Sequence, residues 1–377
     1  MLLRDLLEGN DKMNVERMNK KLTKKVRVGN TFIGGDAPIT VQSMTNTKTE
    51  DVKSTIEQIL KLEEYGCDII RVAVTNFESA SALKIIKKNI HIPLVADIQF
   101  DYRLAIESAK NGADKIRINP GNIGDKEKVK EVVKVLKYYG IPLRIGVNSG
   151  SLQKELLAKY GAPTADALVE SALREVRLLE ELDFTDIVIS IKSSDVLTMI
   201  KAYESVSQKV DYPLHLGVTE AGPLIKSTVK SSVGIGVLLY KGIGDTIRVS
   251  ITGDPVEEVK VGIELLKSLN LKKYGINLIS CPTCARCNVD LISIADKVER
   301  RLTSIKEPLN VAIMGCAVNG PGEAREADIG IAGGNKNFVL FKKGKIEKTV
   351  AESEVVDVLI DEIKKLLDEK KNIVKRQ

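Results

Sequence analysis

The sequence predicts an α/β protein built from a TIM (β/α)8 barrel and a small α+β domain that follows it. The first observation is a series of eight short apolar runs that alternate with amphipathic helical patterns, as the units of such a barrel do. The second is an aliphatic composition, with 4% aromatic residues and no tryptophan, which is typical of parallel strands buried on both faces. The third is a change of pattern after residue 269, where cysteines and shorter apolar runs begin.

The eight apolar runs are the expected barrel strands. They occupy residues 39–41, 69–74, 93–98, 115–118, 143–147, 186–192, 214–218 and 246–251. Gly66, Gly112 and Gly140 stand where helices are expected to end before the next strand. A doubly wound open sheet is the alternative. That fold usually carries a glycine-rich phosphate loop after its first strand, whereas Gly34-Gly35 precede the first strand here.

The chain is expected to divide into a charged lead-in, residues 1–25, a barrel, residues 26–269, and a second domain, residues 270–377. In the second domain, short apolar runs at residues 311–314, 329–331 and 338–341 alternate with helical patterns at residues 290–301 and 353–367. This pattern predicts a small α+β sandwich of the ferredoxin-like or sulfite-reductase-like type.

Composition and charge exclude several classes of protein. No apolar stretch is long enough to span a bilayer, and the charged N-terminus has no apolar segment typical of a secretory signal. Five cysteines, four of them clustered, are unlike a secreted disulfide framework. We therefore expect a reducing, cytoplasmic setting. The net charge of +6 comes from lysines without interleaved aromatic residues, so we expect a solvated surface and no nucleic-acid partner.

Five cations interrupt apolar runs that otherwise avoid charge: Arg71, Arg117, Arg144, Lys192 and Arg248. In a TIM barrel, functional side chains lie at the carboxyl ends of the strands. Other polar residues in or after these runs are Asp97, Asn119, Asn148, His215, Glu220 and Ser250. One such arginine alone is more often part of an ion pair inside the barrel, and His215 is as readily explained as a packed barrel histidine. Five cations on five strands exceed the nearby acids and require an anion to balance them, which predicts a phosphate or diphosphate ligand.

Four cysteines form the second constellation: Cys281, Cys284, Cys287 and Cys316. The spacing C-x2-C-x2-C suits an iron–sulfur cluster and also suits structural zinc. Cys316 follows an apolar run and precedes a tight Asn-Gly-Pro-Gly loop and Glu323, with no histidine nearby. This arrangement favours a cluster with three thiolates and one weaker ligand. Structural zinc and a dithiol redox pair remain as alternatives.

Both constellations resemble one known family. Residues 281–284 (CPTC) and 315–324 (GCAVNGPGEA) are similar to the cluster domain of the 4-hydroxy-3-methylbut-2-enyl diphosphate synthases. The resemblance extends over the barrel, at residues 41–44, 68–72, 96–103, 116–124, 215–222 and 248–250. It implies a [4Fe-4S] cluster held by Cys281, Cys284, Cys316 and Glu323. Cys287 departs from the family pattern, which leaves open which three thiolates bind.

The resemblance also implies a set of diphosphate contacts: Arg71, Arg117, Arg144, Asn148, Lys192, Thr219, Arg248 and Ser250. Asp97 and Asn119 would line the same site, and His215 is a weaker candidate. Gln99 stands where the family commonly has histidine. Because an amide cannot transfer a proton, we assign Gln99 no acid–base role and expect Glu220 to handle the proton.

The implied activity is the reductive ring opening and dehydration of 2-C-methyl-D-erythritol 2,4-cyclodiphosphate to (E)-4-hydroxy-3-methylbut-2-enyl diphosphate, a step of non-mevalonate isoprenoid synthesis. No flavin or nicotinamide motif is present, so a ferredoxin or flavodoxin is the expected electron donor. The family also implies a homodimer. Two rival interpretations are a metabolite-binding barrel with a zinc-stabilised tail and a radical enzyme, although the C-x3-C-x2-C motif of the latter is missing.

Overall fold

The computed structural model describes residues 20–119, 123, 126–316 and 327–374. The chain separates into two compact units, residues 1–272 and residues 273–377. Each unit has its own sheet and its own core, and each is described by itself below.

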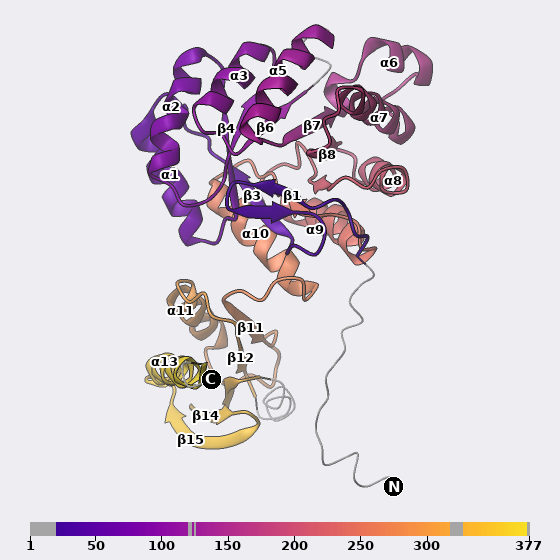
Figure 1. Ribbon diagram of the computed structural model, residues 1–377. Coiled ribbons are helices and arrows are strands. Elements are labelled where there is room, and N and C mark those ends of the chain that lie inside the picture. Colours follow the sequence, from indigo (N-terminus) through magenta and orange to yellow (C-terminus); the bar gives the residue numbers. More distant parts are fainter. Residues whose placement is uncertain (1–19, 120–122, 124–125, 317–326, 375–377) are drawn as a thin grey trace, which may run out of the picture. The chain divides into compact units, whose positions relative to one another are not determined.

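The first unit is built on eight parallel strands (Figure 1). They are β3 (Thr40–Met44), β4 (Ile69–Ala73), β5 (Leu94–Ile98), β6 (Lys115–Ile118), β7 (Leu143–Asn148), β8 (Ile187–Lys192), β9 (His215–Leu216) and β10 (Thr246–Ile247). Their order in the sheet is β8-β7-β6-β5-β4-β3-β10-β9. An isolated parallel bridge between Ile189 and Leu214 joins β8 to the segment before β9 and brings the two edges of the sheet together.

A buried tyrosine strengthens this join between β8 and β9. The Tyr203 hydroxyl accepts a hydrogen bond from the Ile191 backbone N–H at 2.9 Å and donates one to the His215 carbonyl oxygen. One side chain therefore adds hydrogen bonds where β9, with two residues, can make few ladder bonds to β8. Burial raises the pKa of Tyr203, so the hydroxyl keeps the proton that it donates.

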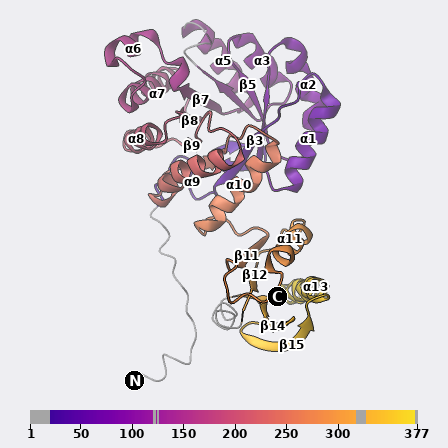
Figure 2. The same ribbon diagram turned by 180° about the vertical axis from the view of Figure 1, so that it is seen from behind.

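Helices cover the outer face of the strands (Figures 1 and 2). They are α1 (Val52–Glu64), α2 (Phe77–Lys88), α3 (Tyr102–Lys110), α5 (Lys126–Tyr139), α6 (Lys154–Tyr160), α7 (Ala165–Glu181), α8 (Val196–Ser207), α9 (Leu224–Tyr240) and α10 (Pro255–Ser268), with a 3-10 turn at Ser149–Ser151. Asp51, Asp195 and Asp254 cap the first turns of α1, α8 and α10. Gly66, Gly112 and Gly140 have positive φ where helices end, as expected from the sequence.

Strand alternation decides which side chains enter the barrel. Val41 and Ile247 lie against Gly262 of α10, and Leu216 lies against Gly244 outside the strands. Their neighbours, Gln42, His215 and Thr246, are fully buried and therefore point inward. Polar side chains consequently occupy much of an interior that is apolar in most such barrels.

A hairpin closes the amino-terminal end of the barrel. Its strands, β1 (Val26–Val28) and β2 (Thr31–Ile33), pair in antiparallel register. Val28 and Ile33 form one buried cluster with Ile69 and Val95, which lie near the starts of β4 and β5. Apolar side chains thus close the amino-terminal end of the barrel. The polar side chains of the interior lie beyond them, toward its carboxyl end.

The second unit is a five-stranded mixed sheet with the order β11-β12-β13-β14-β15. Its elements are β11 (Ile276–Ser280), α11 (Leu291–Leu302), β12 (Leu309–Met314), β13 (Ile329–Gly333), β14 (Asn337–Lys342), β15 (Lys345–Ala351) and α13 (Val355–Val374). β11, β12 and β13 are parallel, whereas β14 and β15 pair in antiparallel register. Apolar residues of α11 and α13 share one core with the sheet.

The structure confirms the predicted barrel followed by an α+β domain. Each of the eight apolar runs overlaps one barrel strand. The β1–β2 hairpin and the strands β11 and β15 were not expected from the sequence. No described helix is both long and apolar enough to cross a membrane.

Candidate functional site

A cluster of buried charges fills the barrel interior and its carboxyl end. Arg71 projects from β4, Asp97 from β5 and Arg117 from β6, and each is at most 6% exposed. Arg117 extends over Gly146 of β7, where an added Cβ would lie 2.5 Å from the Arg117 Nε. A residue larger than glycine at this position would displace the guanidinium.

Asp97 is the carboxylate between two of these cations. Its Oδ1 accepts from Arg117 Nη1 at 2.9 Å and from Gln99 Nε2 at 3.0 Å. Its Oδ2 lies 3.6 Å from Arg71 Nε. Burial alone would raise the pKa of Asp97, but Arg71, Arg117 and Arg144 hold it below its usual value. Gln99 therefore serves as a hydrogen-bond donor to Asp97. This role does not require it to transfer a proton.

Glu258 is a second buried carboxylate, and it was not predicted from the sequence. It lies on α10 and is 4% exposed. Its Oε1 accepts from Arg248 Nη2 at 2.9 Å, and its Oε2 accepts from Ser43 Oγ at 2.9 Å. The sequence shows only that Glu258 lies on the inner face of an amphipathic helix. Its partner Ser43 is 215 residues away, so the contact between them could not be predicted from the sequence.

Arg144 and His215 lie deeper than the other predicted residues. Both are fully buried, and all their side-chain nitrogens lack a partner among the described residues. Arg144 occupies the second position of β7 and is paired in register with Arg117. Burial, followed by the nearby Arg144, lowers the pKa of His215 well below its usual value, so this imidazole is neutral at pH 7.

Lys192 ends β8 and is 6% exposed. Burial lowers its pKa well below the usual value, and Arg71 and Arg248 act in the same direction. Asn119 is buried and donates to Ser151 Oγ at 2.9 Å. Asn148, Thr219 and Ser250 are half-buried at the ends of their strands or just beyond.

Glu220 is the predicted residue that stands apart. It is exposed and has φ of 52° in the loop after β9. No hydrogen bond or ion pair of its side chain is found among the described residues. The buried acids of the site are therefore Asp97 and Glu258, and Glu220 lies at its edge.

The charges in this interior do not balance. Six cationic residues, Arg71, Lys115, Arg117, Arg144, Lys192 and Arg248, face two carboxylates, Asp97 and Glu258. Buried charge without a counter-charge is costly. Because guanidinium groups bind phosphate oxygens with two parallel hydrogen bonds, the arrangement is suited to a small polyanion.

The cysteines lie at the carboxyl ends of two adjacent parallel strands of the second unit. Cys281 follows β11, and Cys316 comes two residues after β12, with Ser280 paired to Ile313 in register. The Gly315 backbone N–H donates to Cys281 Sγ at 3.2 Å. A Cβ on Gly315 would lie 2.7 Å from Cys287 Sγ. The sulfurs of Cys281 and Cys287 thus both touch the residue before Cys316.

Cys284 is exposed in the turn between them, where its carbonyl oxygen accepts from the Cys287 N–H at 2.9 Å. Within the described residues, no three His, Cys, Asp or Glu side chains are grouped closely enough to hold a metal ion. The expected ligand Glu323 lies outside the described residues. The thiols around Gly315, with an N–H donated to sulfur, still match the donor set of an iron–sulfur cluster.

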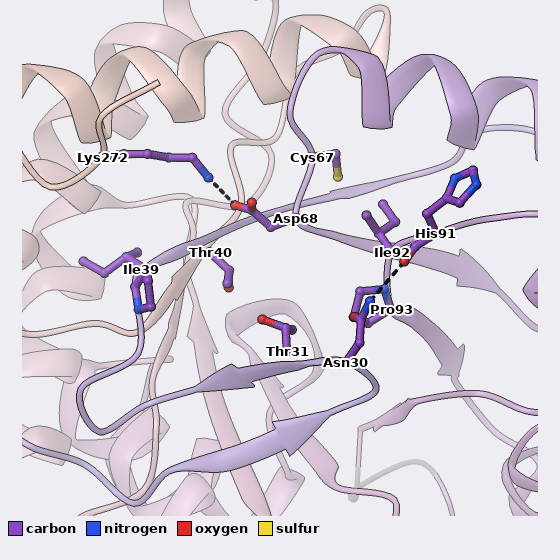
Figure 3. Close-up of a pocket in the computed structure, with 11 residues that line it drawn as sticks. Asn30, Thr31, Ile39, Thr40, Cys67, Asp68, His91, Ile92, Pro93 and Lys272 are labelled. Carbon is purple, nitrogen blue, oxygen red and sulfur yellow. Dashed lines mark hydrogen bonds and ion pairs between the residues drawn. The ribbon is translucent and has the colours of Figure 1, made fainter. Parts of the chain in front are cut away.

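A pocket of about 370 Å³ lies at the opposite, amino-terminal end of the barrel (Figure 3). Lys272 Nζ contacts Asp68 Oδ2 at 2.6 Å there, and the same oxygen accepts from the Val41 N–H at 2.8 Å. Burial raises the pKa of the Cys67 thiol to about 12. Since a protonated buried thiol is a poor nucleophile, Cys67 is not a candidate nucleophile.

Comparison with known proteins identifies the family. The sequence matches the GcpE TIM-barrel domain over residues 23–263 and the GcpE protein C-terminal domain over residues 277–365. A 4-hydroxy-3-methylbut-2-en-1-yl diphosphate synthase (flavodoxin) from Caldanaerobacter subterraneus is 63% identical over 350 residues, which cover 93% of this chain and 99% of that protein. The synthase of the same description from Caldicellulosiruptor saccharolyticus is 64% identical over 342 residues, covering 91% and 98%. The chain therefore belongs to the GcpE family of 4-hydroxy-3-methylbut-2-en-1-yl diphosphate synthases.

Proposed function

We propose that this chain converts 2-C-methyl-D-erythritol 2,4-cyclodiphosphate to (E)-4-hydroxy-3-methylbut-2-enyl diphosphate by reductive ring opening and loss of water. The observation that carries this proposal is the excess of buried cations over carboxylates in the barrel. A cyclic diphosphate supplies the missing negative charge, and its two phosphoryl groups can contact cations from several strands at once.

We call the cations that would bind the diphosphate, Arg71, Arg117, Arg144, Lys192 and Arg248, the diphosphate clamp. Each of them has a specific task in this proposal. Arg71 and Arg117 bind diphosphate oxygens while Asp97 holds their side chains in place. Arg248 binds from the opposite side, oriented by Glu258. Asn119, Asn148, Thr219 and Ser250 donate hydrogen bonds at the rim. Lys192 lies level with Asn148 on the neighbouring strand, and Arg144 adds positive charge below. Fixed donors of this kind orient the substrate before reaction.

Glu220 is our choice for the residue that supplies a proton to the leaving oxygen. The oxygen lost from the substrate must leave as water, because hydroxide is a poor leaving group without a proton or a metal. Glu220 is exposed at the edge of the cation cluster, so it can exchange protons with solvent between turnovers.

Cys281, Cys284, Cys316 and Glu323 would hold the [4Fe-4S] cluster in this proposal. Such a cluster supplies single electrons at low potential and one iron with an exchangeable ligand. The chain contributes the Gly315 N–H bond to Cys281 Sγ, which stabilises a thiolate there. The family relatives are named as flavodoxin-dependent, so we propose flavodoxin rather than ferredoxin as the donor.

The activity is tested with protein purified without oxygen and loaded with iron and sulfide. Reduced flavodoxin and the cyclic diphosphate should yield the open diphosphate at a rate that falls sharply in Arg71→Met. Arg174→Met, on the surface of α7, is the matched control. Absence of turnover by fully loaded protein contradicts the proposed reaction.

The ligand set is tested separately by iron analysis and visible absorption. About four irons per chain are expected, with altered absorption in Glu323→Ala and loss of iron in Cys284→Ala. Cys67→Ala removes a buried thiol of the barrel and should change neither. One zinc per chain, lost in Cys287→Ala, would establish the zinc alternative.

We further propose that the chain forms a homodimer, which is supported by an apolar stripe on α9. Ile225, Val229, Val233 and Tyr240 recur at helical spacing and are 79%, 58%, 48% and 70% exposed. Such a continuous stripe is typical of an interaction surface. Light scattering should report dimers for the natural chain and monomers for Val229→Lys. Tyr138→Lys, at an exposed aromatic residue of α5, should leave the dimer intact.

A further inference from the structure

Lys115 is a buried basic residue for which the proposed reaction has no task. It is the first residue of β6 and is fully buried. Its Nζ has no hydrogen-bond partner among the described residues. It shares an inward face with Arg117, two residues later, and is paired in register with Val95. Lys115 therefore lies one layer below the pair of Asp97 and Arg117.

The groups that surround Lys115 offer it no counter-charge. Arg71 of β4 and Arg144 of β7 lie within electrostatic reach of it, and Lys115 itself acts on His215 of β9. The other inward positions are neutral: Thr40 and Gln42 of β3, Val95 of β5, Ser190 of β8 and Thr246 of β10. The buried carboxylates of the barrel are already paired, Asp97 with Arg117, Glu258 with Arg248, and Asp245 with Lys20.

The amine is also cut off from solvent below. Val28 and Ile33 of the hairpin pack against Ile69 and Val95 at the amino-terminal end of the barrel. An ammonium ion held here would lose its hydration without gaining a partner. Burial first, and then Arg144 and Arg71, lower the pKa of Lys115 well below its usual value. Both effects favour the neutral amine in the free protein.

We propose that Lys115 is a proton-accepting site built beneath the diphosphate clamp, neutral in the free protein and protonated when a diphosphate occupies the clamp. This inference rests on the proposed function, because the clamp must first bind the polyanion. The bound anion reverses the local field by offsetting Arg71, Arg117 and Arg144. The amine then takes one proton from solvent and becomes an ammonium, and no other bond forms or breaks.

The consequence is a coupling between ligand binding and pH. If the complex holds more protons than the free protein, lower pH favours the complex. Affinity for diphosphate should therefore rise as pH falls through the neutral range. Lys192 and His215 have lowered pKa values in the same field, so the share of Lys115 has to be measured by difference.

The test is isothermal titration with inorganic pyrophosphate at one pH in buffers of different ionisation enthalpy, which gives the number of protons taken up. Lys115→Met should take up about one proton fewer per site than the natural chain. Lys110→Met is the matched control, because Lys110 ends α3, is half exposed and pairs with Glu107. It should take up the same number as the natural chain.

Two results separate this inference from the proposed function. Pyrophosphate binding with unchanged proton uptake in Lys115→Met would overturn the role of Lys115 and leave the clamp intact. Failure of the natural chain to bind pyrophosphate would overturn the clamp and the inference with it. Should Lys115→Met not fold, carbon-13 NMR of labelled lysines in the natural chain decides. A Lys115 signal already typical of ammonium in the free protein would also overturn the proposal.

Discussion

Asp97 shows how a single carboxylate can orient two buried cations. It pairs with Arg117 at 2.9 Å and lies 3.6 Å from Arg71, so one negative charge orients two cations. The local balance stays positive, and the guanidinium groups are held in place before a ligand arrives. Glu258 does the same for Arg248 from α10. The two acids thus orient the cations, whereas the excess of positive charge would attract the anion.

Replacing Arg117 with methionine should weaken pyrophosphate binding by roughly 10- to 100-fold, since a hydrogen bond between charged groups is worth about 1.5–3 kcal/mol. The methionine keeps much of the apolar side chain, so the barrel should remain folded. Isothermal titration measures the effect. Arg174→Met, which breaks a surface pair with Glu170, should bind normally. Equal affinity in both variants would show that Arg117 does not contact the anion.

The sequence predicted the buried cations of the barrel better than the acids that pair with them. Arg71, Arg117 and Arg248 were found because charge is unusual inside apolar runs. Glu258 was not, because its contacts with Ser43 and Arg248 depend on how α10 packs against β3 and β10. How deep Arg144 lies in the barrel could also not be predicted from the sequence. The register of the strands determines this depth, and the amino-acid pattern alone does not specify the register.

At the scale of elements, the join between β8 and β9 depends on Tyr203. Removing its hydroxyl leaves the Ile191 N–H and the His215 carbonyl oxygen without a partner inside the barrel. We expect Tyr203→Phe to lower the free energy of unfolding by about 2–6 kcal/mol, because each of the two buried unsatisfied groups costs roughly 1–3 kcal/mol. Urea unfolding measures this. Tyr212→Phe, which removes a partly exposed hydrogen bond to Glu180, should cost far less.

Glu175 gives α7 a pH dependence of its own. Burial raises the pKa of Glu175 to about 7, and its contact with Gln153 Nε2 is long at 3.4 Å. The folded pKa is above the unfolded value of 4.5. The neutral acid therefore contributes stability below pH 4.5, and this contribution is lost as pH rises through 7.

Glu175→Gln should accordingly be more stable than the natural chain at pH 8, by about 1–3 kcal/mol, and equally stable near pH 4. Thermal unfolding at the two pH values checks the difference. A gain that is the same at both pH values would mean that the carboxyl group does not titrate as its burial implies.

The elements that the sequence predicted are those with strongly apolar patterns. All eight barrel strands fall in this class because both of their faces are covered. β15 was missed because six of its seven residues are exposed, so no apolar run marks it. The β1–β2 hairpin has only three residues in each strand, too few for a period to be recognised.

At the scale of the whole barrel, the strands of the sheet form two groups that differ in length. β3 to β8 have four to six residues each, whereas β9 and β10 have two. Arg71, Arg117, Arg144 and Lys192 lie on the longer strands. Thr219, Glu220, Arg248 and Ser250 lie beyond the ends of the short ones.

Pyrophosphate should therefore slow amide hydrogen exchange most in residues 217–222 and 248–254, where fewer ladder bonds hold the backbone. The amides of β4 to β7 should change little. Exchange followed by mass spectrometry of peptides distinguishes these regions. Equal protection around the whole ring would contradict the expectation.

The short strands also have an evolutionary consequence. The rim of the barrel meets its ligand with unequal stiffness, firm along the arc from β4 to β8 and compliant at β9 and β10. Substitutions in the firm arc change how strongly an anion is held. Substitutions in the compliant loops change which organic group can accompany that anion. Divergence toward differently shaped diphosphates should begin in those two loops and leave the arginines of the firm arc unchanged.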